Sequence, residues 1–265
     1  MKKSVIAIIL LVLIGGVFVN RVKIKNLWSD LSRPEMPQAV EYQEIDKKTE
    51  NFLPESDSLL EEKLKTEDQR PKTEDLIPTS FNLNVPFTSQ APFADWNETF
   101  KEACEEAAIL TVHYFYQNKE FTPKVATDEI LKMVDWQVSN WGGHFDLTVS
   151  QTAELIKEYL GYQKVEVIDN PTIEDIKFQI YQQHPVIVPA AGRELGNPYF
   201  RQPGPIYHML VIKGYTARQF ITNDPGTKHG QDYLYDDNII MNAMHDWNET
   251  DINQAPQKII IIYPN

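Results

Sequence analysis

Apolar and aromatic residues are divided unevenly along the chain, and this division limits where a folded core can form. Residues 29–80 contain 14 Asp and Glu, 7 Lys and Arg, five prolines and no glycine, and their only aromatic residues are Tyr42 and Phe52. Such a segment cannot bury enough apolar surface to offset the entropy lost on ordering. We therefore expect an acidic, disordered stalk over 29–80. Residues 81–265, which hold four of the five tryptophans, are expected to form one domain.

The first 28 residues have the composition of a targeting segment. Two lysines precede an uncharged run over residues 5–19, and three basic residues follow it. The run fits a signal-peptide core and is short for a membrane span, which needs roughly 20 residues. Because no small-x-small cleavage site follows, we expect 1–28 to be an uncleaved single-pass anchor, with the domain outside the cytoplasm. A cleaved signal peptide, which would leave the domain secreted, is the alternative.

Charge and cysteine content narrow the function classes of the domain. Residues 81–265 carry 13 basic and 24 acidic residues, which argues against nucleic acid as a partner because phosphate binding needs basic patches. Cys104 is the only cysteine, so the chain has no internal disulfide. In an exported protein an odd cysteine is either a reactive thiol or a site of dimer formation.

Periodicity predicts helices first and paired strands later, which is typical of an α+β domain with an antiparallel sheet. Helices are expected from Cys104, over about 127–135, from a cap at Asp146 or Thr148 to Leu160, after the Thr172 cap, and within 235–247. Residues 139–146 are expected to be a loop. Strands are expected at 165–168, 184–191, 207–215, 219–224 and 258–264, with a short strand or extended entry at 82–90.

Four residues in order could support nucleophilic catalysis. Cys104 lies where a helix begins, and the unpaired N–H groups and positive end of a helix lower the pKa of a thiol there. His208, at the start of a strand, could act as the general acid and base. Asp224, after the next strand, could orient the imidazole, and Gln90 could donate its amide to an oxyanion.

Each of these residues also has a purely structural interpretation. A free cysteine is often a small core residue, and a single histidine is often a satisfied core group. Asp224 precedes Pro225 and Gly226, as turn residues do, and Gln90 could be a surface amide. The order of the four favours the functional interpretation. His144 and Asp146 lack a third ligand at matching spacing, so neither a metal site nor a cofactor is expected.

The same stretches carry a resemblance to a known family. The segments "VPFTSQAPFADWNETFKEACEEAA", "YHMLVIKGY" and "ITNDPG" resemble the papain-like cysteine peptidases of the bacteriocin-processing, double-glycine leader type. The likeness is greatest to bacterial stand-alone, exported peptidase-like relatives and covers most of 81–265. It implies N-terminal helices packed on a twisted antiparallel sheet. It also implies that Cys104 is the nucleophile, His208 the general acid and base, Asp224 its orienting group and Gln90 an oxyanion donor.

These observations lead to a membrane-tethered, extracytoplasmic cysteine peptidase that acts on a peptide or protein. Leader cleavage is not implied, because no export ATPase accompanies the domain. A catalytically inactive papain-like binding module is a second hypothesis, since Glu105 and Glu106 directly follow the cysteine and would raise its pKa. A cell-wall peptide amidase or acyl transferase is a third. The long Gly- and Pro-containing loop 191–207 is expected to form one wall of the substrate cleft.

Overall fold

The computed structural model describes residues 36–43 and 77–265, so the expected anchor 1–28 and most of the expected stalk 29–80 lie outside the described residues. Within these two ranges, no helix is both long enough and apolar enough to cross a bilayer. The described residues from Pro37 onward belong to one unit.

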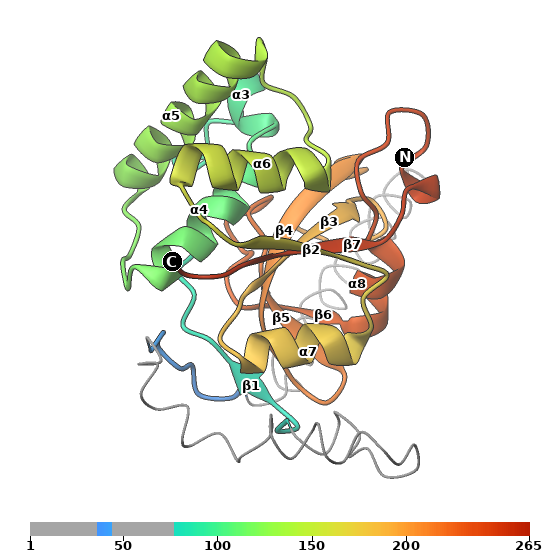
Figure 1. Cartoon of the computed structure of the whole chain (residues 1–265). Coiled ribbons are helices and arrows are strands. Elements are labelled where there is room, and N and C mark those ends of the chain that lie inside the picture. The colour runs from blue at the N-terminus through green and yellow to red at the C-terminus, as the bar shows by residue number, and fades with distance from the viewer. Residues whose placement is uncertain (1–35, 44–76) are drawn as a thin grey trace, which may run out of the picture. The chain divides into compact units, whose positions relative to one another are not determined.

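An antiparallel sheet of seven strands forms the centre of this unit (Figure 1). Its strand order is β2-β7-β3-β4-β5-β6, and β1 pairs with β4 beside this path. The strands are β1 (Phe81–Asn82), β2 (Val165–Asp169), β3 (Val186–Ala191), β4 (Tyr207–Tyr215), β5 (Gln219–Asn223), β6 (Tyr233–Asp236) and β7 (Lys258–Ile262). The expected α+β class with an antiparallel sheet is confirmed.

Six α-helices and one 3-10 turn accompany the sheet in the described ranges. They are α3 (Glu98–Lys101), α4 (Cys104–Tyr116), α5 (Pro123–Trp141), α6 (Val149–Leu160), α7 (Ile173–Tyr181), α8 (Asp237–Ala243) and η3 (Ile252–Gln254). Capping boxes at Thr148 and Thr172 begin α6 and α7, and Gly161 ends α6 in the left-handed region at φ 76°.

Side chains alternate between the two faces of the sheet and build two separate cores. Tyr207 and Met209 of β4 belong to a core shared with α4, α5 and α6. Leu210 and Ile212 belong to a second core, which includes residues of α7 and α8. Figure 1 shows these two groups of helices on opposite sides of the sheet. From Tyr207 to Ile212 the parity of each β4 residue therefore decides which core its side chain enters, and the register shift between Ile212 and Gly214 places Tyr215 in the second core.

Two elements differ from their expected lengths. Helix α5 begins at Pro123, where Thr122 accepts a hydrogen bond from Val125 N, and continues to Trp141 before Gly142 ends it, so part of the expected loop 139–146 is helical. The expected helix over 235–247 is wrong at both ends. Its first residues complete β6, which pairs with β5, and α8 covers only Asp237–Ala243.

A short segment from within the expected stalk packs on the domain. Val40 N donates to Asn82 O at 2.9 Å, and Asn84 N donates to Val40 O at 2.7 Å. The ring of Tyr42 meets Phe115 and Tyr116 edge-on, with centroids 5.5 and 5.1 Å apart. We call residues 37–43 the strap. Its main-chain bonds and its tyrosine make it part of the folded unit.

Candidate active site

Cys104 is the first residue of α4, as the sequence predicts. The helix α3 precedes it, and Asn97 caps α3 by accepting from Phe100 N. The Cys104 side chain is 3% exposed and packs in the core shared with α5 and α6. Nearly the whole of α4 is buried, rather than one face of it, because α5 and the loop before α6 cover its outer side. The thiol therefore lies at a helix N-terminus but in a largely solvent-free environment.

A carboxyl group holds the Cys104 thiol. Sγ donates to Glu105 Oε2 at 3.0 Å, and the other oxygen of Glu105 accepts from Leu147 N at 2.9 Å. Burial raises the pKa of the Cys104 thiol well above its ordinary value, and the charges of Glu105, Asp146 and Glu106 raise it further. The expectation of a thiolate stabilised by the helix terminus is therefore wrong for this arrangement. Burial and a neighbouring carboxylate outweigh the helix field.

Both acidic residues after the cysteine are buried. Burial raises the pKa of Glu105, the charge of Glu106 raises it further, and the Leu147 N–H and the thiol partly oppose this. Glu106 accepts a hydrogen bond from Gln137 Nε2 and lies 3.3 Å from His144 Nε2. Burial alone would lower the pKa of His144, but the hydrogen bond and charge of Glu106 outweigh it and raise that pKa above its ordinary value.

His208 of β4 and Asp224, the residue directly after β5, form a buried hydrogen-bonded pair. His208 Nε2 lies 2.8 Å from Asp224 Oδ1, and the two side chains are 2% and 0% exposed. Burial alone would raise the pKa of Asp224, but the charge of His208 and hydrogen bonds from His208, Tyr235 and the Gly226 N–H bring it below its ordinary value. Asp224 is thus an ionised acceptor, and it fixes the imidazole through one ring nitrogen.

Two further residues that bind Asp224 were not identified from the sequence. Asn197 Nδ2 donates to Asp224 Oδ2 at 3.0 Å, and the Tyr235 hydroxyl donates to the same oxygen at 2.6 Å. Asn197 lies in the segment 191–207 that was expected to form a cleft wall, and it is buried there with Leu195 and Phe200. Tyr235 was assigned to a helix that is in fact β6. No local motif marks either residue, because only the fold brings them to Asp224.

Gln90 connects the two halves of the candidate site. Its backbone N–H donates to Pro225 O at 3.0 Å. Its side-chain Nε2 donates to Phe100 O at 3.0 Å and to Lys101 O at 2.9 Å, so both amide hydrogens are used, while Oε1 is buried without a partner. In this arrangement the Gln90 amide holds the turn before Cys104 and has no hydrogen left for an oxyanion.

The structure does not join Cys104 to His208. Among the described residues, the hydrogen bond of the thiol goes to Glu105 and that of the imidazole to Asp224. Cys104 packs in the same core as Tyr207, whereas His208, one residue later on β4, contacts Phe200 of the second core with ring centroids 5.3 Å apart. The thiol and the imidazole therefore have different carboxylate partners, Glu105 and Asp224, in this arrangement.

Close packing at His208 depends on two glycines. A Cβ atom at Gly226 would lie 2.9 Å from His208 Cε1, and one at Gly192 would lie 3.1 Å from His208 Cβ and closer still to Pro205. Any side chain there would displace the imidazole or its loop. Over residues 36–43 and 77–265, no three His, Cys, Asp or Glu side chains are grouped so that they could hold a metal ion.

The fold is of the α+β, papain-like class. The chain belongs to the Peptidase_C39 like family, whose model matches residues 82–253. A crystal structure assigned to a C39-like peptidase from Bacillus anthracis is similar at 16% identity and a TM-score of 0.46, over 69% of this chain and 96% of that one. No curated protein matches the chain.

Proposed function

We propose that this protein is a cysteine peptidase in which Cys104 attacks a peptide carbonyl. The observation that carries the proposal is the buried His208–Asp224 pair on β4 and beyond β5, together with a cysteine at the first position of α4. Because Nε2 of His208 is engaged by Asp224, Nδ1 is the nitrogen left to take the thiol proton and to give a proton to the leaving amine.

Catalysis by this set requires the thiol to leave Glu105. In the arrangement described here the proton is on sulfur, because Glu105 accepts the thiol hydrogen bond and burial disfavours a thiolate. Rotation about the Cα–Cβ bond of Cys104 turns the thiol away from Glu105 without moving α4. Once the thiol proton passes to His208, an imidazolium forms beside the Asp224 carboxylate, which stabilises it.

Two donors are available for the oxyanion in this scheme. The Cys104 N–H, at the first position of α4, has no partner within the helix and lies at its positive end. The Gln90 amide becomes the second donor when it releases Phe100 O or Lys101 O. This exchange is a small local rearrangement, because Gln90 is already held next to the turn that leads into Cys104.

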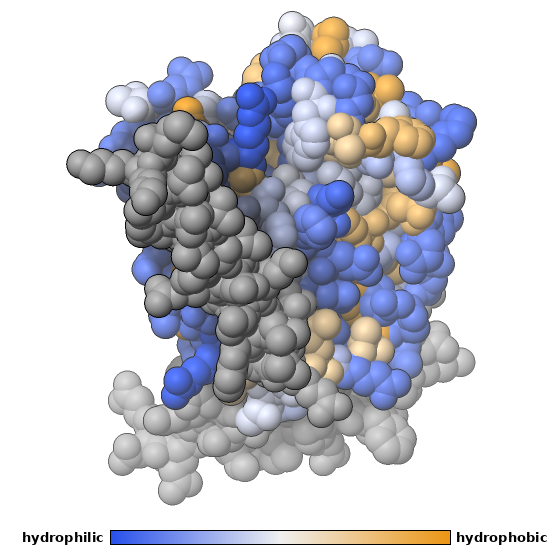
Figure 2. Space-filling model, turned by 180° about the vertical axis from the view of Figure 1, so that it is seen from behind, coloured by the Kyte–Doolittle hydropathy of each residue, from blue (hydrophilic) through white to orange (hydrophobic). Residues whose placement is uncertain are grey.

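Exposed apolar side chains on two loops around the candidate site support a peptide substrate with large apolar residues. Phe93 and Trp96, 65% and 41% exposed, lie between Gln90 and Cys104, and Tyr199 and Ile206, 48% and 56% exposed, lie in the loop before His208. The face of the molecule seen in Figure 2 is largely hydrophilic, with separate apolar spots. Apolar residues gathered on loops that flank reactive groups are typical of a recognition surface.

Membrane attachment and placement outside the cytoplasm are also part of the proposal. They are supported by the sequence of residues 1–28 alone, with its lysines, its uncharged run and its following basic residues. Detection of the chain in a membrane fraction, and accessibility of the domain to an external protease in intact cells, are the corresponding measurements.

Labelling and turnover with the full chain test the peptidase proposal. Wild-type protein should be labelled at Cys104 by a thiol-directed peptide electrophile and should hydrolyse peptides that carry large apolar residues. Cys104→Ala should lose both, and His208→Ala should lose turnover, with both variants retaining the wild-type circular dichroism spectrum. Undiminished peptide hydrolysis by Cys104→Ala would reject the proposal.

A non-catalytic binding module is the second candidate, favoured by the buried thiol and its hydrogen bond to Glu105. It predicts alkylation of Cys104 only well above pH 8.5, the ordinary range of a thiol, both with and without bound peptide. The peptidase proposal instead predicts that a bound apolar peptide accelerates alkylation near pH 7, because binding displaces the thiol from the carboxylate.

A further inference from the structure

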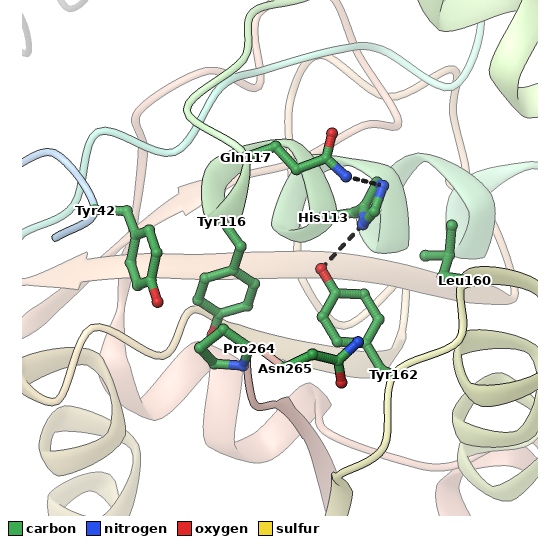
Figure 3. A pocket seen from close by; sticks show the side chains of 8 residues that line it. All are labelled: Tyr42, His113, Tyr116, Gln117, Leu160, Tyr162, Pro264 and Asn265. Carbon is green, nitrogen blue, oxygen red and sulfur yellow. Dashed lines mark hydrogen bonds between the residues drawn. The ribbon is translucent and has the colours of Figure 1, made fainter. Parts of the chain in front are cut away.

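A second site lies away from Cys104, at the other end of α4 (Figure 3). It is a pocket of about 300 Å³. Three tyrosines line it, Tyr42 from the strap, Tyr116 from the last turn of α4 and Tyr162 from the segment after α6. Figure 3 shows their rings side by side, with His113 and Gln117 above them. We call this the tyrosine pocket.

The tyrosine pocket is separate from the candidate active site. His113 follows Cys104 by nine residues on one helix, and a rise of about 1.5 Å per residue separates them by about 14 Å along the axis. None of the residues that line the pocket belongs to the set Gln90, Cys104, His208 and Asp224. The inference below therefore does not depend on cysteine chemistry.

A chain of hydrogen bonds fixes the chemistry of one wall. Lys119 Nζ donates to Gln117 Oε1 at 2.5 Å, and since an ammonium can only donate, this sets the orientation of the amide. Gln117 Nε2 then donates to His113 Nε2 at 2.7 Å. The neutral imidazole must carry its proton on Nδ1, which donates to the Tyr162 hydroxyl at 2.9 Å. Burial and the charge of Lys119 lower the pKa of His113, in agreement with a neutral ring.

This series of hydrogen bonds leaves the Tyr162 hydroxyl as a donor. Its oxygen accepts from His113, so its own hydrogen is free to point elsewhere, and it makes no other hydrogen bond to a described residue. Burial and Tyr42 raise the pKa of Tyr162 to about 12, so the hydroxyl stays protonated at neutral pH. The second hydrogen of the Gln117 amide is a further donor at the same wall. By contrast, the Tyr116 hydroxyl is committed to Ile262 O at 2.7 Å.

The lining indicates an uncharged ligand with both an apolar and a polar side. Tyrosine rings with Leu160 and Pro264 offer flat hydrocarbon surface, while Tyr162 and Gln117 offer donors. No lining side chain is an acid, a lysine or an arginine. A charged ligand would lose its hydration without meeting an oppositely charged Asp, Glu, Lys or Arg side chain in the lining. A volume of about 300 Å³ is at the lower limit of small-molecule sites.

We propose that the tyrosine pocket binds a neutral sugar ring, of the size of a mono- or disaccharide. One face of a pyranose carries C–H groups that pack on one of the tyrosine rings, and its ring and hydroxyl oxygens accept from Tyr162 and Gln117. The strap supplies one of the three rings, so the ligand would also hold the strap on the domain.

Ligand-observed NMR with the full chain tests this inference. The probes are glucose, N-acetylglucosamine and their β-1,4-linked dimers at up to 50 mM, with benzyltrimethylammonium and benzoate as charged ring compounds of similar size. Saturation transfer from the protein is expected to at least one sugar and to neither charged compound. Tyr162→Phe keeps the ring but removes the donor, and it should weaken the dissociation constant about fivefold, as expected for one hydrogen bond.

A matched variant separates loss of binding from loss of folding. Tyr159→Phe removes a hydroxyl from α6 outside the pocket lining, and it should bind as wild type does. Three results would overturn the inference: no sugar binding at 50 mM by folded wild-type protein, equal binding by Tyr162→Phe, or preferred binding of the ammonium or the carboxylate. None of these outcomes bears on the peptidase assays, whose variants lie at Cys104 and His208.

Discussion

The Cys104 thiol donates its hydrogen bond to the carboxylate of the next residue, Glu105, at 3.0 Å, and not to His208. The carboxylate is fixed in turn by the Leu147 N–H, so it is a positioned acceptor rather than a mobile surface charge. Glu105 therefore keeps the resting thiol protonated, and its removal should change the reactivity of the sulfur directly.

Glu105→Gln should lower the pKa of the Cys104 thiol. The substitution keeps the size of the side chain and can keep an acceptor for the Leu147 N–H, but it removes the neighbouring negative charge that raises the pKa. We expect alkylation by iodoacetamide at pH 7 to become about tenfold faster, which corresponds to one pKa unit. Glu154→Gln, on the exposed face of α6, is the control and should alkylate as wild type does. A slower reaction in Glu105→Gln would mean that Glu105 serves as a base instead.

Asp224→Asn should remove turnover without changing the reactive thiol. An amide cannot hold the His208 imidazole as a carboxylate does, and loss of this orientation costs about 10²- to 10⁴-fold in kcat in comparable sites. Stability should fall too, by about 2 kcal/mol, because Asn197 and Tyr235 lose a charged acceptor. The measurements are peptide hydrolysis and urea unfolding, with the exposed Asp169→Asn as the control.

The His208–Asp224 pair predicts a loss of stability in acid. The pKa of Asp224 in the folded state lies below 3.8, its ordinary value. Its carboxylate therefore contributes stability that is present above pH 3.8 and is lost as the pH falls through the lower folded pKa. In Asp224→Asn this decline should be absent, so it should appear as a difference between the wild-type and variant stability curves at acid pH.

His184 provides a second pH-dependent contribution, in a different window. Burial and the charge of Lys164 lower the pKa of His184 to about 4, from an ordinary value of 6.5. As the pH falls, His184 therefore binds its proton in the unfolded chain before it does so in the folded protein. Stability is lost as the pH falls from 6.5 to about 4. We expect His184→Gln to reduce this loss by about 2 kcal/mol, measured by urea unfolding between pH 7 and 4. An identical pH dependence in the variant would contradict the assignment.

Tyr42→Ala should destabilise the domain although residue 42 lies far from the domain in the sequence. The ring makes edge contacts with Phe115 and Tyr116, each of which contributes about 1 kcal/mol. We expect a decrease of about 2 kcal/mol in the free energy of unfolding, read from thermal or urea denaturation. Phe93→Ala, at an aromatic ring that is 65% exposed, should change stability by less than about 0.5 kcal/mol. Equal effects of the two variants would show that the strap does not stabilise the fold.

Local patterns were sufficient for most of the secondary structure. Thr148, Thr172 and Gly161 carry the capping chemistry of α6 and α7 in their own residue types, and the apolar runs at β4 and β7 match buried strands. β6 was missed because "YDDNIIM" has a helical composition, and its pairing with β5 is a contact between separate segments. The strap was missed because its ordering depends on an edge of β1 and on two rings of α4.

The amino-acid sequence by itself determined the family, the α+β class and the residue types available for chemistry, because these follow from local patterns and from the order of motifs. Only the tertiary structure decided that Glu105 is buried against the thiol, that Asn197 and Tyr235 complete the environment of Asp224, and that the thiol and the imidazole bind different carboxylates. The physical reason is that burial, and the side of a sheet on which a group lies, are set by packing between distant segments. These two factors control the pKa and the partners of a reactive group more strongly than its sequence neighbours do.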